Sequence, residues 1–251
     1  MKKTISVITL IPRSSRFYAE QVQALFGQWA QVHSYSTGDR SVEGIVESDL
    51  YLLSTDAFED AQEARRYVPS DGQVVEIQLT YPKEVIQDLK RIPRGTRVLF
   101  VNATRQMARE AITQLEQLGV NQIGFEPYGP DSPVPEGLDI AVTPDEAGFV
   151  PPGMKKVINI GHRPCTPGTM IEAAIRLGLE GLLEEKQFQN YMKTMASGNY
   201  SFDEMFARSR KMESRFDILL EILDEGMVGV NEKGEVYACN QKAKEITGVN
   251  R

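Results

Sequence analysis

Cysteine and histidine are scarce in this chain, which has two of each among its 251 residues. Cys165 and Cys239 are far apart in the sequence, so neither a disulfide framework nor a zinc site is expected. A long apolar run is also missing, since no stretch approaches the ~20 residues of a membrane-spanning helix. The apolar start of the chain is interrupted by Ser6 and Thr9 and ends at Pro12, which predicts a buried strand rather than a signal peptide. We therefore expect a protein of the reducing cytoplasm, with no metal and no membrane contact.

Positive charge is deficient as well, because 35 acidic residues outnumber 28 Lys and Arg residues and give a net charge of −7. Nucleic acid backbones are bound by clustered Lys and Arg, so this segment is not expected to contact DNA directly. The sequence also lacks the glycine-rich nucleotide fingerprints and the G-x-S-x-G nucleophile motif. His162 and Cys165 are close in sequence, but Pro164 lies between them and no third orienting group is evident. Neither an enzyme nor a bound cofactor is therefore predicted.

The residues that are present form an alternating pattern of strands and helices. Helical one-face spacing occurs at Tyr18, Val22, Leu25 and Trp29, and again from Met107 to Leu118. Short β-branched runs, typical of strands, lie before, between and after these helices. They cover residues 4–11, 31–35, 49–54, 74–79, 96–101, 122–125, 138–142 and 156–160. The alternation predicts an α/β fold with parallel sheets, because parallel strands need such crossovers.

This pattern begins twice. A strand, a loop with Arg13 and Ser14, and a helix open the chain; a strand, a loop with Thr104 and Arg105, and a helix follow residue 96. Pro93 and Gly95 suggest a break between the two halves. We predict an α/β domain over residues 1–180 with two Rossmann-like lobes, at 1–90 and 96–180, joined near 91–95 and by a return crossing. One large sheet is the alternative.

The strand pattern ends after Gly181. An amphipathic helix is expected from Leu182 to Met195, and apolar residues recur at heptad spacing from Phe202 to Leu223. We predict a helical connector over 181–215 and a homodimer held by the heptad seam. A helix packed on its own domain is the alternative.

From Phe216 the sequence resembles the opening of a PAS domain. The matching features are a helix, then Asp224, Gly226 and Met227, two strands at 227–230 and 235–238, and a turn at Lys233-Gly234. A PAS domain has about 100 residues, and far fewer remain here. We therefore expect a truncated PAS start over 216–251 and a longer natural protein.

Polar and basic residues follow the predicted strands at the places where parallel sheets bind ligands. In such sheets, ligands lie beyond the carboxyl ends of the strands and near the N-termini of helices. Hydroxyl and amide side chains there offer hydrogen bonds, and arginine binds carboxylate or phosphate through two parallel hydrogen bonds. We predict that a small anionic metabolite binds between the lobes, held mainly by Arg13 and Arg105. The predicted ligand-binding residues are Arg13, Ser14, Ser15, Ser54, Thr55, Asn102, Thr104, Arg105, His162 and Arg163.

Other polar residues have different explanations. Thr143 and Thr169 are each followed three residues later by Glu, which predicts capping boxes. Asp56 follows the third predicted strand, as the phosphorylated Asp of a receiver domain does. The paired acids that a receiver carries after its first strand are absent, so phosphorylation of Asp56 is not predicted.

Residues 97–105 and 156–163, together with the PAS-like opening, resemble the N-terminal half of sigma-54-dependent transcriptional activators of the propionate-catabolism regulator type, the PrpR N-terminal family. The resemblance implies two chelatase-like lobes with a ligand cleft between them and a role in signal sensing. It also implies, beyond this segment, the rest of PAS, an ATP-binding AAA+ ATPase that remodels sigma-54 RNA polymerase, and a DNA-binding helix-turn-helix. An interaction module without a small-molecule ligand and a Rossmann-like enzyme are the alternatives.

Overall fold

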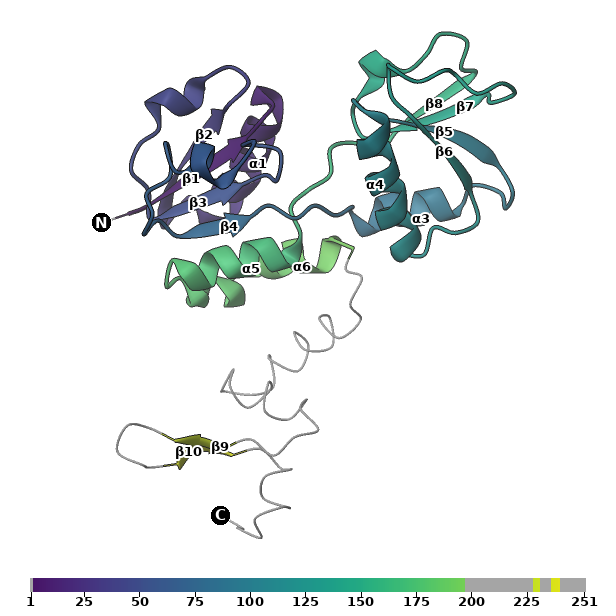
Figure 1. Cartoon of the computed structure of the whole chain (residues 1–251). Helices are drawn as coiled ribbons and strands as arrows, with labels where there is room; N and C mark the ends of the chain where they lie inside the picture. The colour runs from purple at the N-terminus through teal and green to yellow at the C-terminus, as the bar shows by residue number, and fades with distance from the viewer. Residues whose placement is uncertain (1, 197–227, 231–235, 240–251) are drawn as a thin grey trace. The chain divides into compact units, whose positions relative to one another are not determined.

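The computed structural model of the chain describes residues 2–196, 228–230 and 236–239 (Figure 1). The chain divides into two compact units, Met1–Gly198 and Asn199–Arg251. The first unit contains two separate four-stranded parallel sheets with helices between the strands. The predicted α/β fold is therefore confirmed, and the alternative of one large sheet is wrong.

The first sheet has the strand order β2-β1-β3-β4. Both faces of its central strand β1 are buried, because the neighbouring Val7 and Ile8 point to opposite faces and are both fully buried. The helix after β1 ends at Phe26, which is fully buried. Trp29 was predicted to lie on the apolar face of this helix, but it follows the end of the helix. The elements of this lobe are β1 (Lys3–Thr9), α1 (Pro12–Phe26), β2 (Ala30–Ser36), η1 (Ser41–Gly44), β3 (Leu50–Leu53), α2 (Ala61–Ala64) and β4 (Val74–Glu76).

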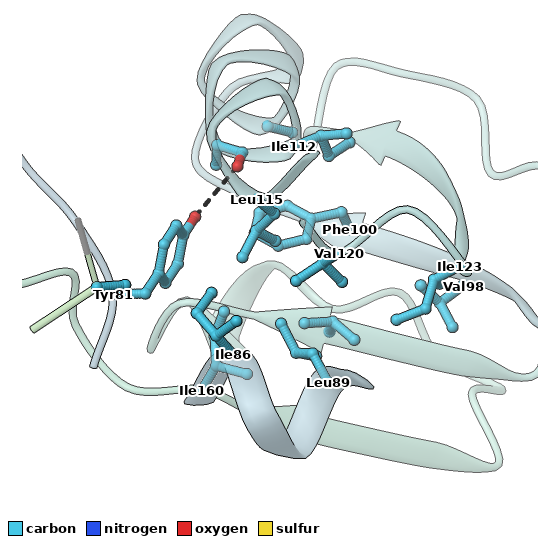
Figure 2. Close-up of a cluster of buried hydrophobic side chains, with 14 residues drawn as sticks. Tyr81, Ile86, Leu89, Val98, Phe100, Ile112, Leu115, Val120, Ile123 and Ile160 are labelled. Carbon is cyan, nitrogen blue, oxygen red and sulfur yellow. Dashed lines mark hydrogen bonds between the residues drawn. The ribbon is translucent and has the colours of Figure 1, made fainter. Parts of the chain in front are cut away.

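The second sheet repeats the same arrangement, with the order β6-β5-β7-β8. On its central strand β5, Val98 and Phe100 join the core beneath α3 and α4, shown in Figure 2, while Leu99 and Val101 join a core on the other face. The elements of this lobe are α3 (Lys83–Lys90), β5 (Arg97–Val101), α4 (Arg105–Gln117), β6 (Gly124–Tyr128), β7 (Ile140–Thr143), η2 (Ala147–Phe149) and β8 (Lys156–Asn159). The doubled start predicted from the sequence therefore corresponds to two sheets of equal topology.

The boundary between the lobes differs from the predicted one. Helix α3 buries Ile86 and Leu89 in the core of the second lobe, so the chain crosses at residues 79–82 rather than at 91–95. The return crossing lies at residues 163–166, where Leu79 pairs with Cys165 and the Thr80 amide donates to the Pro164 carbonyl at 2.8 Å. The first lobe thus comprises residues before 79 together with the segment after 166.

A third segment of chain joins these two crossings. The Thr80 hydroxyl donates to the Ala196 carbonyl at 2.7 Å, and the Ala196 amide donates to the Tyr81 carbonyl at 2.8 Å. Pro82 and Met195 form a further antiparallel bridge. We call residues 79–82, 163–166 and 195–196 together the hinge.

The helices after the return crossing pack on the first lobe. They are α5 (Pro167–Arg176), η3 (Glu180–Glu184) and α6 (Lys186–Thr194). The ring of Phe188 on α6 packs edge-on against Phe26, with centroids 6.0 Å apart, and the Tyr191 hydroxyl donates to the Cys165 carbonyl at 2.6 Å. The predicted connector over 181–215 is therefore divided, because residues up to 196 belong to the lobed unit.

In the second unit, two strands are described, β9 (Val228–Val230) and β10 (Val236–Cys239), which pair antiparallel. They coincide with the two strands expected for the start of a PAS domain. The heptad seam from Phe202 to Leu223 lies outside the described residues, so the predicted coiled coil and the PAS assignment stay predictions. Within the described ranges, no helix is both long and apolar enough to cross a membrane.

Candidate functional site

A cleft of about 510 Å³ is lined by residues of both lobes. Each sheet reverses its strand order beside its first strand, between β1 and β3 and between β5 and β7. Such switch points at the carboxyl ends of parallel strands are where α/β sheets bind ligands. Here both switch points contribute to one cleft, lined by Thr9, Ile11, Ser14, Tyr18, Ser54, Thr55, Asp56, Ile77, Leu79, Asn102, Met107, Glu110, Gln114, Pro144, Glu146, His162 and Arg163.

The wall from the first lobe is formed by the start of α1. Ser14 and Tyr18 lie one turn apart on this helix, so both face the cleft. The N-cap residue Ile11 supplies no side-chain acceptor, and Pro12 occupies the first turn. The first amides of α1, with the positive end of the helix dipole, therefore remain available to a negatively charged group.

Two side-chain amides in the second lobe leave hydrogen-bonding atoms unsatisfied. Asn102 is 2% exposed, and its Oδ1 accepts from the Ala103 amide at 2.8 Å, while its Nδ2 has no partner among the described residues. Gln114 donates through Nε2 to the Leu79 carbonyl, and its buried Oε1 has no partner within the same part of the chain. The cleft thus offers one unused donor and one unused acceptor, and the acceptor, Gln114 Oε1, is buried, which makes it costly to leave unpaired.

Arg163 supplies positive charge from the hinge. Its positive charge lies close to Tyr81, and the Tyr81 hydroxyl donates to the Ala111 carbonyl at 3.3 Å (Figure 2). Burial raises the pKa of Tyr81 to about 12, and the nearby Arg163 opposes this rise. Burial likewise raises the pKa of Tyr18, again opposed by Arg163. No carboxylate in the described part of the chain forms an ion pair with Arg163, which leaves its charge available to a ligand.

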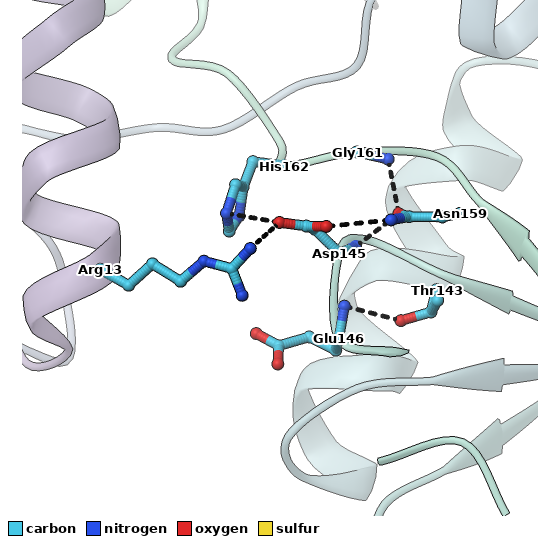
Figure 3. Close-up of polar contacts among 7 residues, drawn as sticks. All are labelled: Arg13, Thr143, Asp145, Glu146, Asn159, Gly161 and His162. Carbon is cyan, nitrogen blue, oxygen red and sulfur yellow. Dashed lines mark hydrogen bonds and ion pairs between the residues drawn. The ribbon is translucent and has the colours of Figure 1, made fainter. Parts of the chain in front are cut away.

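A polar network around Asp145 bridges the lobes at the edge of the cleft (Figure 3). Asp145 adopts a left-handed backbone with φ of 67°, and Asn159 bonds both its amide and its carboxylate at 2.9 Å. The other carboxylate oxygen contacts His162 Nε2 at 2.9 Å and accepts a hydrogen bond from Arg13 of the first lobe. The Asn159 hydrogen bond, aided by His162 and Arg13, holds the pKa of Asp145 below its ordinary value. Arg13 is therefore already paired.

Three carboxylates also line the cleft, from Asp56, Glu110 and Glu146. Asp56 accepts a hydrogen bond from Ser54, and Glu110 accepts one from Gln106 at 2.9 Å. The half-buried Glu146 carboxylate has no hydrogen-bond or ion-pair partner in the described residues. Burial raises the pKa of Glu146, although the charges of His162 and Arg13 work against the rise. The cleft is therefore mainly acidic, with Arg163 as its unpaired cation.

Six of the ten residues predicted to bind a ligand line the cleft: Ser14, Ser54, Thr55, Asn102, His162 and Arg163. The other four do not. Arg13 pairs with Asp145, and the buried Ser15 hydroxyl donates to the carbonyl of its own helix start at 3.0 Å. Thr104 caps α4 by accepting from a backbone amide at 3.1 Å, and Arg105 is exposed on the first turn of that helix.

Sequence reasoning missed several lining residues and misplaced one cap. Glu110 and Gln114 share a face of α4 with Met107, and this spacing could have indicated them once the helix was assigned to a cleft wall. The Thr143 hydroxyl accepts from the Glu146 amide at 3.0 Å, but the Glu146 carboxylate makes no return bond within the described residues and Glu146 itself precedes η2, so only half of the predicted capping box is present. The predicted cap at Thr169 is wrong, because the residue three positions earlier caps α5. Thr169 instead accepts a hydrogen bond from the backbone of the first lobe at 3.1 Å.

Cys165 does not have the environment of a nucleophile. It is fully buried, and burial raises the pKa of its thiol to about 12. The ring of His162 packs on Phe17, with centroids 4.6 Å apart, and its Nε2 contacts Asp145.

Comparisons of the chain with protein-family models, with curated proteins and with solved structures found no match. In the described ranges, no group of three or more His, Cys, Asp or Glu side chains is placed to hold a metal ion.

Proposed function

We propose that residues 2–196 are the signal-sensing region of a transcription regulator and bind a small carboxylate-bearing metabolite in the cleft between the lobes. The unpaired positive charge of Arg163 is the main support for this proposal. Arg163 is an arginine without an acidic partner in the described residues, in a cleft where both switch points meet. An arginine fork matches the geometry of a carboxylate, and the unused Asn102 donor and the start of α1 offer further hydrogen bonds.

The hinge explains how binding would be transmitted. Arg163 lies on the return crossing with its charge close to Tyr81 on the first crossing, so a ligand held by Arg163 would act at the hinge. Ala196 is bonded to Thr80 and Tyr81 at the same point, two residues before the end of the first unit. Closure of the two lobes around a ligand would change the direction in which the chain leaves this unit.

The larger context follows from the family resemblance. The segment would belong to a cytoplasmic sigma-54-dependent activator of the propionate-catabolism regulator type, and would control an AAA+ ATPase and a DNA-binding domain outside this segment. The heptad spacing from Phe202 to Leu223 supports dimerisation of such a regulator.

A thermal-shift screen of small carboxylates, amino acids and coenzyme A esters, followed by calorimetry, tests the proposal, because a ligand of the native state raises apparent stability. We expect Arg163→Gln to weaken binding of the best hit roughly tenfold to a hundredfold, since a charge-assisted contact contributes about 1.5–3 kcal/mol. Arg105→Gln is the matched control, because Arg105 is exposed and outside the cleft lining; it should bind like the wild type. Equal affinities for the Arg163 variant and the wild type would refute the assignment.

A further inference from the structure

The charges that line the cleft point to a narrower class of ligand. We propose that the ligand is amphoteric, carrying a protonated amine as well as a carboxylate, as a free amino acid does. This inference rests on the proposed function, because it concerns the same cleft. Arg163 and the start of α1 would receive the carboxylate, and Glu146 would receive the amine.

The balance of charge disfavours a ligand that carries only negative charge. Arg13 and His162 contact Asp145, and their charges also favour the ionised form of Glu146, but Asp56 and Glu110 have no cationic partner in the described residues. A polycarboxylate would satisfy Arg163 but place its other charges near the lining carboxylates. Such repulsion grows as a cleft closes, because water is excluded and the effective dielectric falls.

Glu146 is the carboxylate best suited to an ammonium group. It is half-buried, and nothing in the described residues donates a hydrogen bond to its carboxylate. Figure 3 shows this carboxylate directed away from Thr143 and toward the side from which Arg13 extends. The carboxylate of Asp56 already accepts from Ser54, so Glu146 has the greater need of a donor.

The unsatisfied amides of the cleft support the same conclusion independently of its charges. Gln114 Oε1 is a buried acceptor without a partner, which suits the N–H groups of an amine. Asn102, 98% buried, has an unpartnered Nδ2 donor in the part of the chain that the structure describes, which suits a carboxylate oxygen. An amphoteric ligand satisfies donor and acceptor alike, whereas a polycarboxylate satisfies only the donor. The cleft volume of about 510 Å³ is appropriate for a small molecule.

The test compares ligands that differ only in the amine. Calorimetry on the whole chain would use the common amino acids and their amine-free counterparts, for example L-glutamate with glutarate, L-aspartate with succinate, and L-alanine with propionate. In at least one pair the amino acid should bind at least tenfold more tightly. If the amine-free acid binds at least as tightly as its amino acid in every pair, the inference is overturned and the proposed function still stands. If no amino acid and no carboxylate binds, both fail.

Two variants then locate the amine. Glu146→Gln should remove most of the preference for the amino acid while leaving the affinity of the amine-free acid unchanged or improved. Glu116→Gln, at an exposed carboxylate on α4 outside the cleft lining, should keep the full preference. A preference that survives in the Glu146 variant would overturn the assignment of the amine to Glu146. Because the ligand pairs are compared on the wild type as well, a misfolded variant would not decide the outcome.

Discussion

A buried side-chain hydrogen bond joins the first crossing to residues 195–196, and Thr80→Val removes it with little change in shape. Thr80 and Ala196 are 2% and 7% exposed, and the hydroxyl donates to the Ala196 carbonyl at 2.7 Å. Valine keeps the branched side chain but leaves this carbonyl without its donor, which costs about 1–3 kcal/mol. For a unit of this size, about 1 kcal/mol corresponds to roughly 2–4 °C in Tm, so we expect a decrease of roughly 2–12 °C.

The decrease in stability should be concentrated at the hinge. Hydrogen exchange should speed up at the Ala196 amide, which donates to the Tyr81 carbonyl, by roughly fivefold to a hundredfold, since each 1.4 kcal/mol is about tenfold. Thr113→Val is the matched control, because the Thr113 hydroxyl donates to a carbonyl on an exposed face of α4 at 3.0 Å. That change should stay within about 0.5 kcal/mol of the wild type. If the two variants have equal stability and equal exchange at Ala196, the hydrogen bond does not hold the chain to the hinge.

Three further predictions concern the cleft and its supports. Burial raises the pKa of Glu146, so the folded state favours the protonated side chain. Its contribution to folding stability is present below the ordinary Glu pKa of about 4.3 and is lost as pH rises through the higher folded pKa. Glu146→Gln should therefore raise Tm at neutral pH but not in acid, and an equal effect at both pH values would contradict this. The pKa of Asp145 is lowered, so its contribution is present above about 3.9 and is lost as pH falls through the folded value. Asp145→Asn, which tolerates the left-handed backbone, should be less stable than the wild type in urea unfolding near neutral pH, with the difference disappearing in acid; a difference that persists in acid would argue against the ionised form. A Cβ at Gly129 would lie 2.4 Å from the Arg105 amide nitrogen, so Gly129→Ala should lose about 1–3 kcal/mol in urea unfolding. Gly148→Ala, which meets open space, should lose less than about 0.5 kcal/mol, and equal losses would show that the backbone at Gly129 can yield.

Strand β5 was predictable because it buries its apolar residues in an unbroken run. β5 contributes Val98 and Phe100 to one core and Leu99 and Val101 to another, and a run buried on both faces is conspicuous in a sequence. The repeated strand, loop and helix also predicted two sheets. Both predictions used information within a few neighbouring residues.

The boundary of the lobes was not predictable in this way. Pro93 and Gly95 mark a turn inside the second lobe, between α3 and β5, and local turn chemistry does not distinguish it from a domain boundary. The apolar face of α3 shows that the helix packs on a sheet, but not on which one. Its packing with Val98 and Phe100 depends on contacts that no local pattern encodes.

The candidate site was predictable in its position but not in its charges. Arg13, Arg105 and Arg163 all follow strands, so the rule that ligands bind beyond strand carboxyl ends selects all three equally. Which arginine lacks an acidic partner depends on the fold, because Arg13 pairs with Asp145, 132 residues away in the sequence. The acidic lining was missed because Glu146 was read as part of a capping box, whereas only its backbone amide bonds to Thr143.

We expect a ligand in the cleft to act through the hinge on the end of the lobed unit. Hydrogen exchange measured by mass spectrometry, with and without the tightest-binding amino acid of the calorimetric panel, tests this most directly. We predict slower exchange at the starts of α1 and α4 together with slower exchange in all three hinge segments, 79–82, 163–166 and 195–196. Protection confined to the cleft walls, with 195–196 unchanged, would contradict the claim.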